Sequence, residues 1–230
     1  MKRKLLLLLL FGIAISLAGI LPTPASASLI IPLNFEYSGG TPPSGSTPWI
    51  TATFDSIQSD TDTVRLTMEA DNLIGSEFIS KWYFNLNPAL DPNDIVADNF
   101  SFTRVSGAGL EKGIDAFKAG PDGMFDLLFD FPIPNGGSAD RFEGGDKVAL
   151  DLTLAGGLVP SDFNFLSAPG NESGDKGPFL SAAHIQSIGG GSGWIAPNPN
   201  PNPVPEPASM LLVSAGLIGL AGFGRRRFKA

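Results

Sequence analysis

Two stretches of the sequence, TVRLTMEA at residues 63–70 and KVALDLTL at residues 147–154, indicate the fold class. In both stretches apolar side chains alternate with mainly polar ones, which is the two-residue period of a β-strand with one buried face. Antiparallel sheets commonly bury one face and leave the other in water. Each stretch is therefore predicted to be a half-buried strand of an antiparallel sheet.

Seven more segments have the length and apolar content of strands. They cover residues 29–36, 49–57, 78–86, 99–105, 125–131, 162–166 and 182–188. Clusters of Gly, Pro, Asn and Asp, which favour turns, separate them. Residues 113–119 are a candidate for one short helix. We therefore expect an all-β domain over residues 28–188, an antiparallel β-sandwich of jelly-roll-like type.

The charge of this domain is strongly negative. Residues 28–188 hold eight of the 15 Lys and Arg residues and 22 of the 23 Asp and Glu residues, which gives a net charge of −14. A surface of this charge repels a phosphate backbone, so we expect no nucleic-acid partner. The chain has no cysteine, which excludes disulfides, thiolate metal sites and a cysteine nucleophile.

The first 27 residues have the parts of a secretory signal peptide. Three basic residues at positions 2–4 precede an apolar run over residues 5–21, and Ala25-Ser26-Ala27 follows. The basic end stays in the cytoplasm, the apolar run enters the translocon, and signal peptidase requires small side chains at the positions of Ala25 and Ala27. We expect residues 1–27 to be removed; the alternative is an uncleaved anchor.

A second apolar segment, residues 208–224, has no charged side chain and is followed directly by Arg225, Arg226 and Arg227. As a helix, this segment would reach about 26 Å, close to the ~30 Å hydrocarbon core of a bilayer. Arginine clusters stay on the cytoplasmic side. We predict a single C-terminal transmembrane helix over residues 208–224, with the three arginines as a stop-transfer signal and residues 28–207 across the membrane.

Pro205, Glu206 and Pro207 stand immediately before this helix. A Pro-Glu-Pro motif, a short apolar helix and an arginine cluster, in this order within residues 205–230, resemble the PEP-CTERM protein-sorting signal. The resemblance implies transient anchoring in the inner membrane and cleavage near the motif by an exosortase, a membrane-embedded protease. It also implies delivery to the cell surface or the extracellular space, with an exopolysaccharide matrix or biofilm as the setting.

Residues 189–204, rich in Gly, Pro and Asn, are predicted to link the domain to this signal. The glycines of residues 189–193 indicate a flexible hinge, and the alternating prolines of residues 197–203 favour an extended polyproline II spacer. Trp194 interrupts the linker, and we expect its ring to pack back against the domain.

Acidic side chains gather in several loops of the expected domain, and oxygen ligands in loops are what Ca²⁺ requires. The best candidate ligands are Asp91, Asn93, Asp94 and Asp98. Their spacing lacks the twelve-residue calcium loop that ends in Glu, and Asp in loops also serves simply to form turns. Calcium at these four residues is the one cofactor that the sequence suggests.

The aromatic residues allow two interpretations. The 17 phenylalanines have no polar group and are expected in the core. Trp49, Trp82 and Tyr83 are better candidates for a surface on which sugar rings stack. Trp82 and Tyr83 are consecutive, so in a regular strand they point to opposite faces of the sheet.

Signals of catalysis are poor. His184 is the sole histidine, so a zinc site of three histidines is impossible within one chain. We predict no catalytic residue and expect a non-enzymatic, exported surface or matrix protein. The alternative is a secreted glycan hydrolase or lyase that works with two carboxylates, because such an enzyme needs neither histidine nor cysteine.

Overall fold

The computed structural model describes residues 27–57, 59–133, 140–170 and 176–199. The chain divides into two compact units, Met1–Pro197 and Asn198–Ala230, and the strands described below lie in the first. Ala25, Pro205, Glu206, Pro207 and residues 208–230 lie outside the described residues. Among the described residues, none of the helices could span a lipid bilayer.

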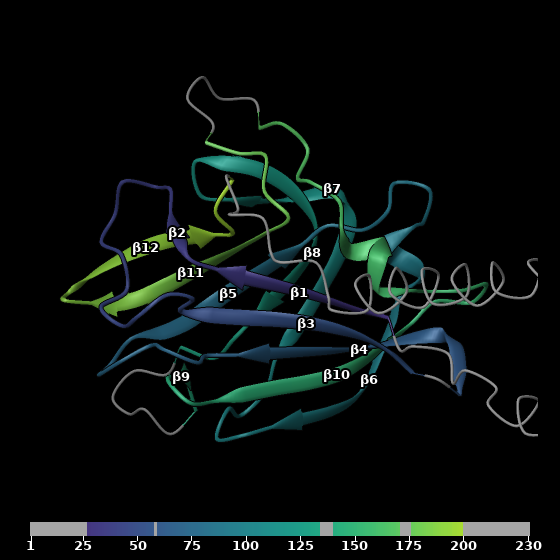
Figure 1. Ribbon diagram of the computed structural model, residues 1–230, viewed down its shortest axis with the longest axis horizontal. Coiled ribbons are helices and arrows are strands. Elements are labelled where there is room, and N and C mark those ends of the chain that lie inside the picture. The colour runs from purple at the N-terminus through teal and green to yellow at the C-terminus, as the bar shows by residue number, and fades with distance from the viewer. Residues whose placement is uncertain (1–26, 58, 134–139, 171–175, 200–230) are drawn as a thin grey trace, which may run out of the picture. The chain divides into compact units, whose positions relative to one another are not determined.

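Five strands form the first sheet. In spatial order they are β1 (Ser28–Leu33), β3 (Ile50–Ile57), β4 (Asp60–Glu69), β10 (Lys147–Thr153) and β6 (Val96–Phe102), and each neighbouring pair is antiparallel. Figure 1 shows β3, β4 and β10 side by side at the centre of this layer. The two stretches that predicted the fold become β4 and β10 and pair directly, Leu66 opposite Leu150.

The second sheet is also antiparallel. Its order is β2 (Phe35–Glu36), β12 (Gly191–Ala196), β11 (Ser181–Ile188), β5 (Phe78–Phe84), β8 (Asp122–Asp130) and β7 (Gly109–Ala119), and β9 (Phe142–Glu143) pairs with β5. These pairings confirm the prediction of an all-β, antiparallel fold.

One large hydrophobic cluster draws on both sheets. On the first sheet, Val64, Leu66 and Met68 of β4 are fully buried, and the polar residues between them are more accessible, as their alternation predicts. On the second sheet, Trp82 and Phe84 of β5 belong to the same cluster. The ring of Phe54 in β3 meets that of Phe84 edge-on at 5.3 Å between centroids. The apolar faces of the two sheets therefore pack against each other, which is the packing of a β-sandwich.

A smaller cluster lies on the other face of the second sheet. It contains Tyr37, Tyr83, Phe125 and Phe179, with Trp194 packed against it. Trp82 faces the large cluster and Tyr83 the small one, so the prediction that these neighbours point to opposite faces is confirmed.

Two segments differ from the sequence prediction. Residues 113–119, the expected short helix, belong to β7, and residues 162–166, an expected strand, begin within the 3₁₀ helix η2 (Pro160–Phe163). A bulge in β7 between Lys112 and Phe117 interrupts its alternation, which hides the strand period. In η2, Pro160 stands at the first turn and the Asp162 carboxylate accepts from the Val159 amide at 3.0 Å, so the local bonds favour a helical turn.

The expected hinge is also wrong. Gly189 and Gly190 have φ of 56° and 89° and form the turn between β11 and β12, and residues 191–196 are strand β12. Gly193 is required because a Cβ there would lie 2.5 Å from the carbonyl oxygen of Thr41. The side chain of Ile195 is fully buried, so the strand is anchored in the core. The domain therefore extends beyond residue 188 to Pro197.

Candidate functional site

The bulge in β7 forms one wall of a pocket of about 230 Å³. The remaining walls come from residues 85–92, which follow β5, from Asp126 of β8 and from residues 165–168 after η2. Residues 113–116 of β7 stand opposite the single position of Asp126, because pairing resumes only at Phe117 with Phe125. Bulges of this kind turn side chains away from the plane of a sheet, and they are common beside functional sites.

Asp126 holds this bulge in place. The residue is 9% exposed, and its two carboxylate oxygens accept from different backbone amides, Asp115 at 2.8 Å and Leu86 at 2.9 Å. A carboxylate buried in a strand needs such donors, since an unpaired charge in the interior is costly. Asp126 therefore links β7 to the segment after β5.

Asp115 stands at the tip of the bulge with φ of 46°, in the left-handed region that Asp and Asn tolerate better than most residues. Desolvation by its surroundings, and then the nearby charge of Asp126, raise the pKa of the Asp115 carboxyl. The residue itself is exposed, so water screens part of this effect. The pocket thus combines a carboxylate fixed by amide groups with a second one that takes up a proton more readily than usual.

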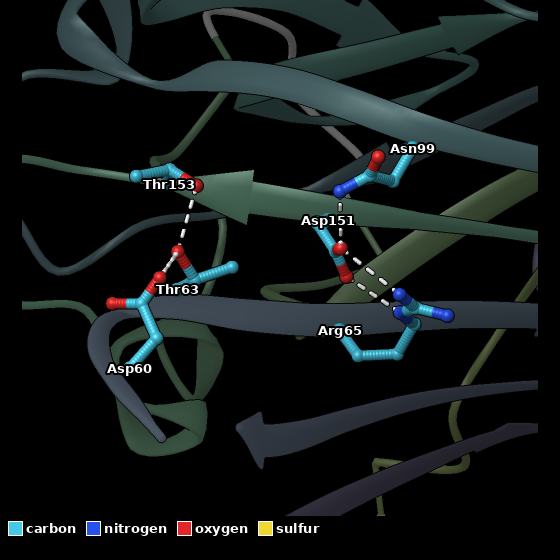
Figure 2. Close-up of polar contacts among 6 residues, drawn as sticks. All are labelled: Asp60, Thr63, Arg65, Asn99, Asp151 and Thr153. Atoms are coloured by element: carbon cyan, nitrogen blue, oxygen red, sulfur yellow. Dashed lines mark hydrogen bonds and ion pairs between the residues drawn. The ribbon is translucent and has the colours of Figure 1, made fainter. Parts of the chain in front are cut away.

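The outer face of the five-stranded sheet carries a different acidic site (Figure 2). Asp151 of β10 lies directly opposite Arg65 of β4, and it accepts from Arg65 Nε at 2.5 Å and from Nη2 at 2.9 Å. Asn99 of β6 donates its Nδ2 to the same carboxylate at 2.9 Å. The hydrogen bonds from Arg65 are the main reason that the pKa of Asp151 is lowered, and they raise the pKa of Arg65. Both oxygens of the Asp151 carboxylate therefore already accept hydrogen bonds from the protein.

A second group on this face is shown in the same view (Figure 2). Thr63 donates its hydroxyl to Asp60 at 2.7 Å and lies 2.8 Å from the hydroxyl of Thr153. The bond from Thr63, followed by the Asp62 amide, lowers the pKa of Asp60. These contacts tie the start of β4 to the end of β10, which is a structural role.

The four candidate calcium ligands do not share one setting. Asp91 caps the short 3₁₀ helix η1 (Pro92–Asp94), where its Oδ1 accepts from the Asn93 amide and Nδ2, both at 2.9 Å. Asp94 is exposed at the end of η1. Asp98 of β6 lies opposite Asp151 of β10 in the register of the five-stranded sheet. Among the described residues, no group of three or more His, Cys, Asp or Glu side chains is placed to hold a metal ion. Calcium binding stays a prediction.

The three candidate sugar-stacking residues do not lie at the surface, so that prediction is wrong. Trp49, Trp82 and Tyr83 are 6%, 0% and 3% exposed. Burial, with Asp130 and Glu111 nearby, raises the pKa of the Tyr83 hydroxyl to about 12. Trp82 and Tyr83 are buried because β5 is covered by the large cluster on one face and by the small cluster on the other, and Trp49 belongs to the large cluster.

His184 and Trp194 stack on each other, with ring centroids 4.6 Å apart. A Cβ on Gly120 would lie 2.8 Å from the Trp194 ring, so the chain at Gly120 covers the ring as well. The expectation that Trp194 packs against the domain is confirmed. His184 Nδ1 is 2.9 Å from the hydroxyl of Ser80, which is 3% exposed. Burial, and secondly Lys81, lower the pKa of His184, which fits a neutral ring within the sheet.

Sequence reasoning missed the pocket. Asp115 fell in the segment expected to be helical, and Asp126 falls in an apolar strand, FDLLFD at residues 125–130. A carboxylate in such a strand is itself a signal, because a buried charge needs partners. The sequence does not show that residues 85–92 and 165–168 lie beside Asp126 in the pocket.

The sorting residues belong to a known sequence motif. No curated protein and no solved structure matches the chain. The sequence model of the PEP-CTERM protein-sorting motif matches residues 203–227, which include Pro205, Glu206 and Pro207, the apolar segment and the three arginines. The chain therefore carries a PEP-CTERM protein-sorting motif, which marks it as a protein sorted through exosortase to the cell surface or the extracellular space.

Proposed function

We propose that this protein is a non-enzymatic component of the cell surface or of an exopolysaccharide-rich extracellular matrix. Its jelly-roll-like β-sandwich is the delivered part, and the sorting motif is the delivery device. The observation that carries the proposal is the match of residues 203–227 to the PEP-CTERM motif. The association with exopolysaccharide rests on the setting that this motif implies.

Delivery proceeds in three steps. Signal peptidase removes residues 1–27 after Ala27, the helix of residues 208–224 then stops in the inner membrane with Arg225, Arg226 and Arg227 in the cytoplasm, and exosortase cleaves near residues 205–207. From the sequence, the two prolines are expected to keep Glu206 out of the helix, because proline fixes φ and disfavours a helical conformation in the residue before it. Glu206 then places the negative charge of the motif at the membrane surface. Spacer residues 197–207 would extend roughly 30 Å as polyproline II and hold the domain clear of the lipid head groups.

The non-enzymatic part of the proposal is supported by how the carboxylates are used. Both oxygens of Asp126 and both oxygens of Asp151 already accept hydrogen bonds from the protein. A net charge of −14 over residues 28–188 favours a hydrated, soluble surface module.

Processing is tested in the native host with Glu206→Ala. We expect the variant to remain in the membrane fraction as a larger product, because the protease loses the charged residue of its motif. Asn202→Ala, which lies just outside the matched residues, is the control and should be processed like the wild type. Release of the Glu206→Ala protein at wild-type mass contradicts exosortase processing.

One observation favours the alternative of a carboxylate-dependent glycan hydrolase or lyase. Two carboxylates, Asp115 and Asp126, line the pocket, and the pKa of Asp115 is raised, as a general acid requires. Cleavage of the host's exopolysaccharide by the wild type, and not by Asp115→Asn, supports this function over the non-enzymatic one.

A further inference from the structure

The pocket beside the β7 bulge has a mixed lining that points to a class of ligand. Its volume is about 230 Å³, below the ~300 Å³ at which pockets for drug-sized molecules begin. It therefore suits a small molecule or a single side chain. Its walls combine two carboxylates with amide and apolar side chains.

The charge of the pocket is not neutralised by its own walls. None of the described residues that line it is Lys, Arg or His. The Asp126 carboxylate accepts hydrogen bonds from two backbone amides, those of Leu86 and Asp115. Asp115 stands beside this charge, and the raised pKa of Asp115 expresses both desolvation and the repulsion from Asp126. By contrast, Asp151 and Asp146 each meet an arginine, at 2.5 and 2.6 Å.

Apolar side chains flank Asp115. Ile114 is 66% exposed and Leu166 is 57% exposed, although both line the pocket. A ligand that covers these exposed aliphatic side chains is stabilised, because apolar surface is removed from water. A matching ligand needs a positive head for Asp115 and an aliphatic body for Ile114 and Leu166.

We propose that this pocket binds an alkylammonium group, with the ammonium on the Asp115 carboxylate and the aliphatic chain along Ile114 and Leu166. The group has two sources, the side chain of a lysine in a partner protein and a free aliphatic amine. Ca²⁺ fits the lining less well, because it takes six to eight oxygen ligands and the exposed parts of Ile114 and Leu166 offer none. This site lies in the delivered domain and adds ligand binding to the proposed function without depending on the sorting step.

The direct test is a titration of the full-length chain, in nonionic detergent, with pentylammonium. The reporters are the backbone amide NMR signals of Leu86 and Asp115, which donate to Asp126. We expect both signals to shift and saturate. The uncharged isostere 1-pentanol should bind at least tenfold more weakly, because it lacks the ionic hydrogen bond.

Asp115→Asn is the matching variant, because Asn tolerates the left-handed backbone and the fold should persist. It should bind pentylammonium about tenfold more weakly. Asp71→Asn changes the net charge equally at an exposed turn outside the pocket and should bind like the wild type. A lysine analogue blocked at both backbone ends separates the sources: binding as tight as that of pentylammonium indicates a lysine side chain, and much weaker binding indicates a free amine.

Three results would overturn the proposal. They are equal binding of 1-pentanol and pentylammonium, equal loss in Asp71→Asn and Asp115→Asn, and displacement of pentylammonium by Ca²⁺ at the same two amides with greater affinity. None of them affects cleavage at residues 205–207, so a failure here is distinguishable from a failure of the sorting proposal.

Discussion

Asp151 and Asp115 are the same side chain in opposite surroundings. On the five-stranded sheet, Asp151 is 5% exposed and receives three hydrogen bonds from Arg65 and Asn99, and its pKa is lowered. On the edge strand of the other sheet, Asp115 is exposed beside a second carboxylate, and its pKa is raised. The first carboxylate contributes to stability, and the second is left for a partner from outside.

The difference comes from register. In β4 and β10 the ladder is regular, so Arg65 lies directly opposite Asp151 and the two outward side chains meet. In β7 the ladder breaks at residues 113–116, and the residue opposite the break is Asp126, of the same charge. The regular β4–β10 ladder thus pairs Asp151 with Arg65, and the bulge in β7 places Asp115 beside Asp126.

The strongest test of this contrast is to remove the paired carboxylate with Asp151→Ala. We expect the free energy of unfolding in urea to fall by about 2 kcal/mol, because two charge-assisted bonds and one amide bond are lost while Arg65, 41% exposed, regains water. The pKa of Asp151 is lowered in the folded state, so its contribution is present above the unfolded pKa and is lost as pH falls through the folded pKa. The variant should therefore lose less stability on acidification than the wild type.

A double-mutant cycle with Arg65→Met identifies the pair as the cause. If the two residues act as a unit, the double variant should lose less stability than the two single variants added together, by about 1 kcal/mol. A change below about 0.5 kcal/mol in Asp151→Ala would place this pair among ordinary surface ion pairs.

The unpaired carboxylate should respond in the opposite direction. At neutral pH we expect Asp115→Asn to be more stable than the wild type by about 0.5 kcal/mol, because it removes a repulsion that solvent partly screens. The raised pKa means that the wild type regains this stability when Asp115 is protonated, as pH falls through its folded pKa. Denaturation at two pH values should therefore show a difference between the proteins at pH 7 that vanishes in acid. A less stable variant at pH 7 would mean that Asp115 makes a stabilising contact.

The sequence predicts the regular parts of this molecule and misses the irregular ones. Alternation located β4 and β10 because every second residue there is apolar and buried. It failed at residues 113–116, where the bulge shifts the period, and at residues 191–196, where glycines resemble a linker although Ile195 and Trp194 are packed in the domain. The sorting motif was readable because it depends on order and spacing along the chain. The pocket was not, because its walls come from segments about 80 residues apart, such as Asn85 and Phe165.

The smallest expected effect concerns Ca²⁺ at Asp91, Asn93, Asp94 and Asp98. Asp91 Oδ1 already accepts two hydrogen bonds from Asn93. Asp98 lies in strand β6 of the five-stranded sheet, opposite Asp151 in register. The acidic surface still makes mutual repulsion a cost at low ionic strength, so any cation at a sufficient concentration should raise the melting temperature by screening. We therefore expect CaCl₂ and NaCl, matched in ionic strength, to raise the melting temperature of the full-length chain equally.

A specific site would behave differently. Saturation at 100 times its Kd would add about 2.7 kcal/mol to the free energy of unfolding. Asp91→Asn would abolish that excess, and Asp71→Asn would not. A rise in melting temperature that occurs only in CaCl₂ and depends on Asp91 would show that these four side chains form a cation site. Asp91 would then resemble Asp115, as a carboxylate that binds a ligand from outside the chain.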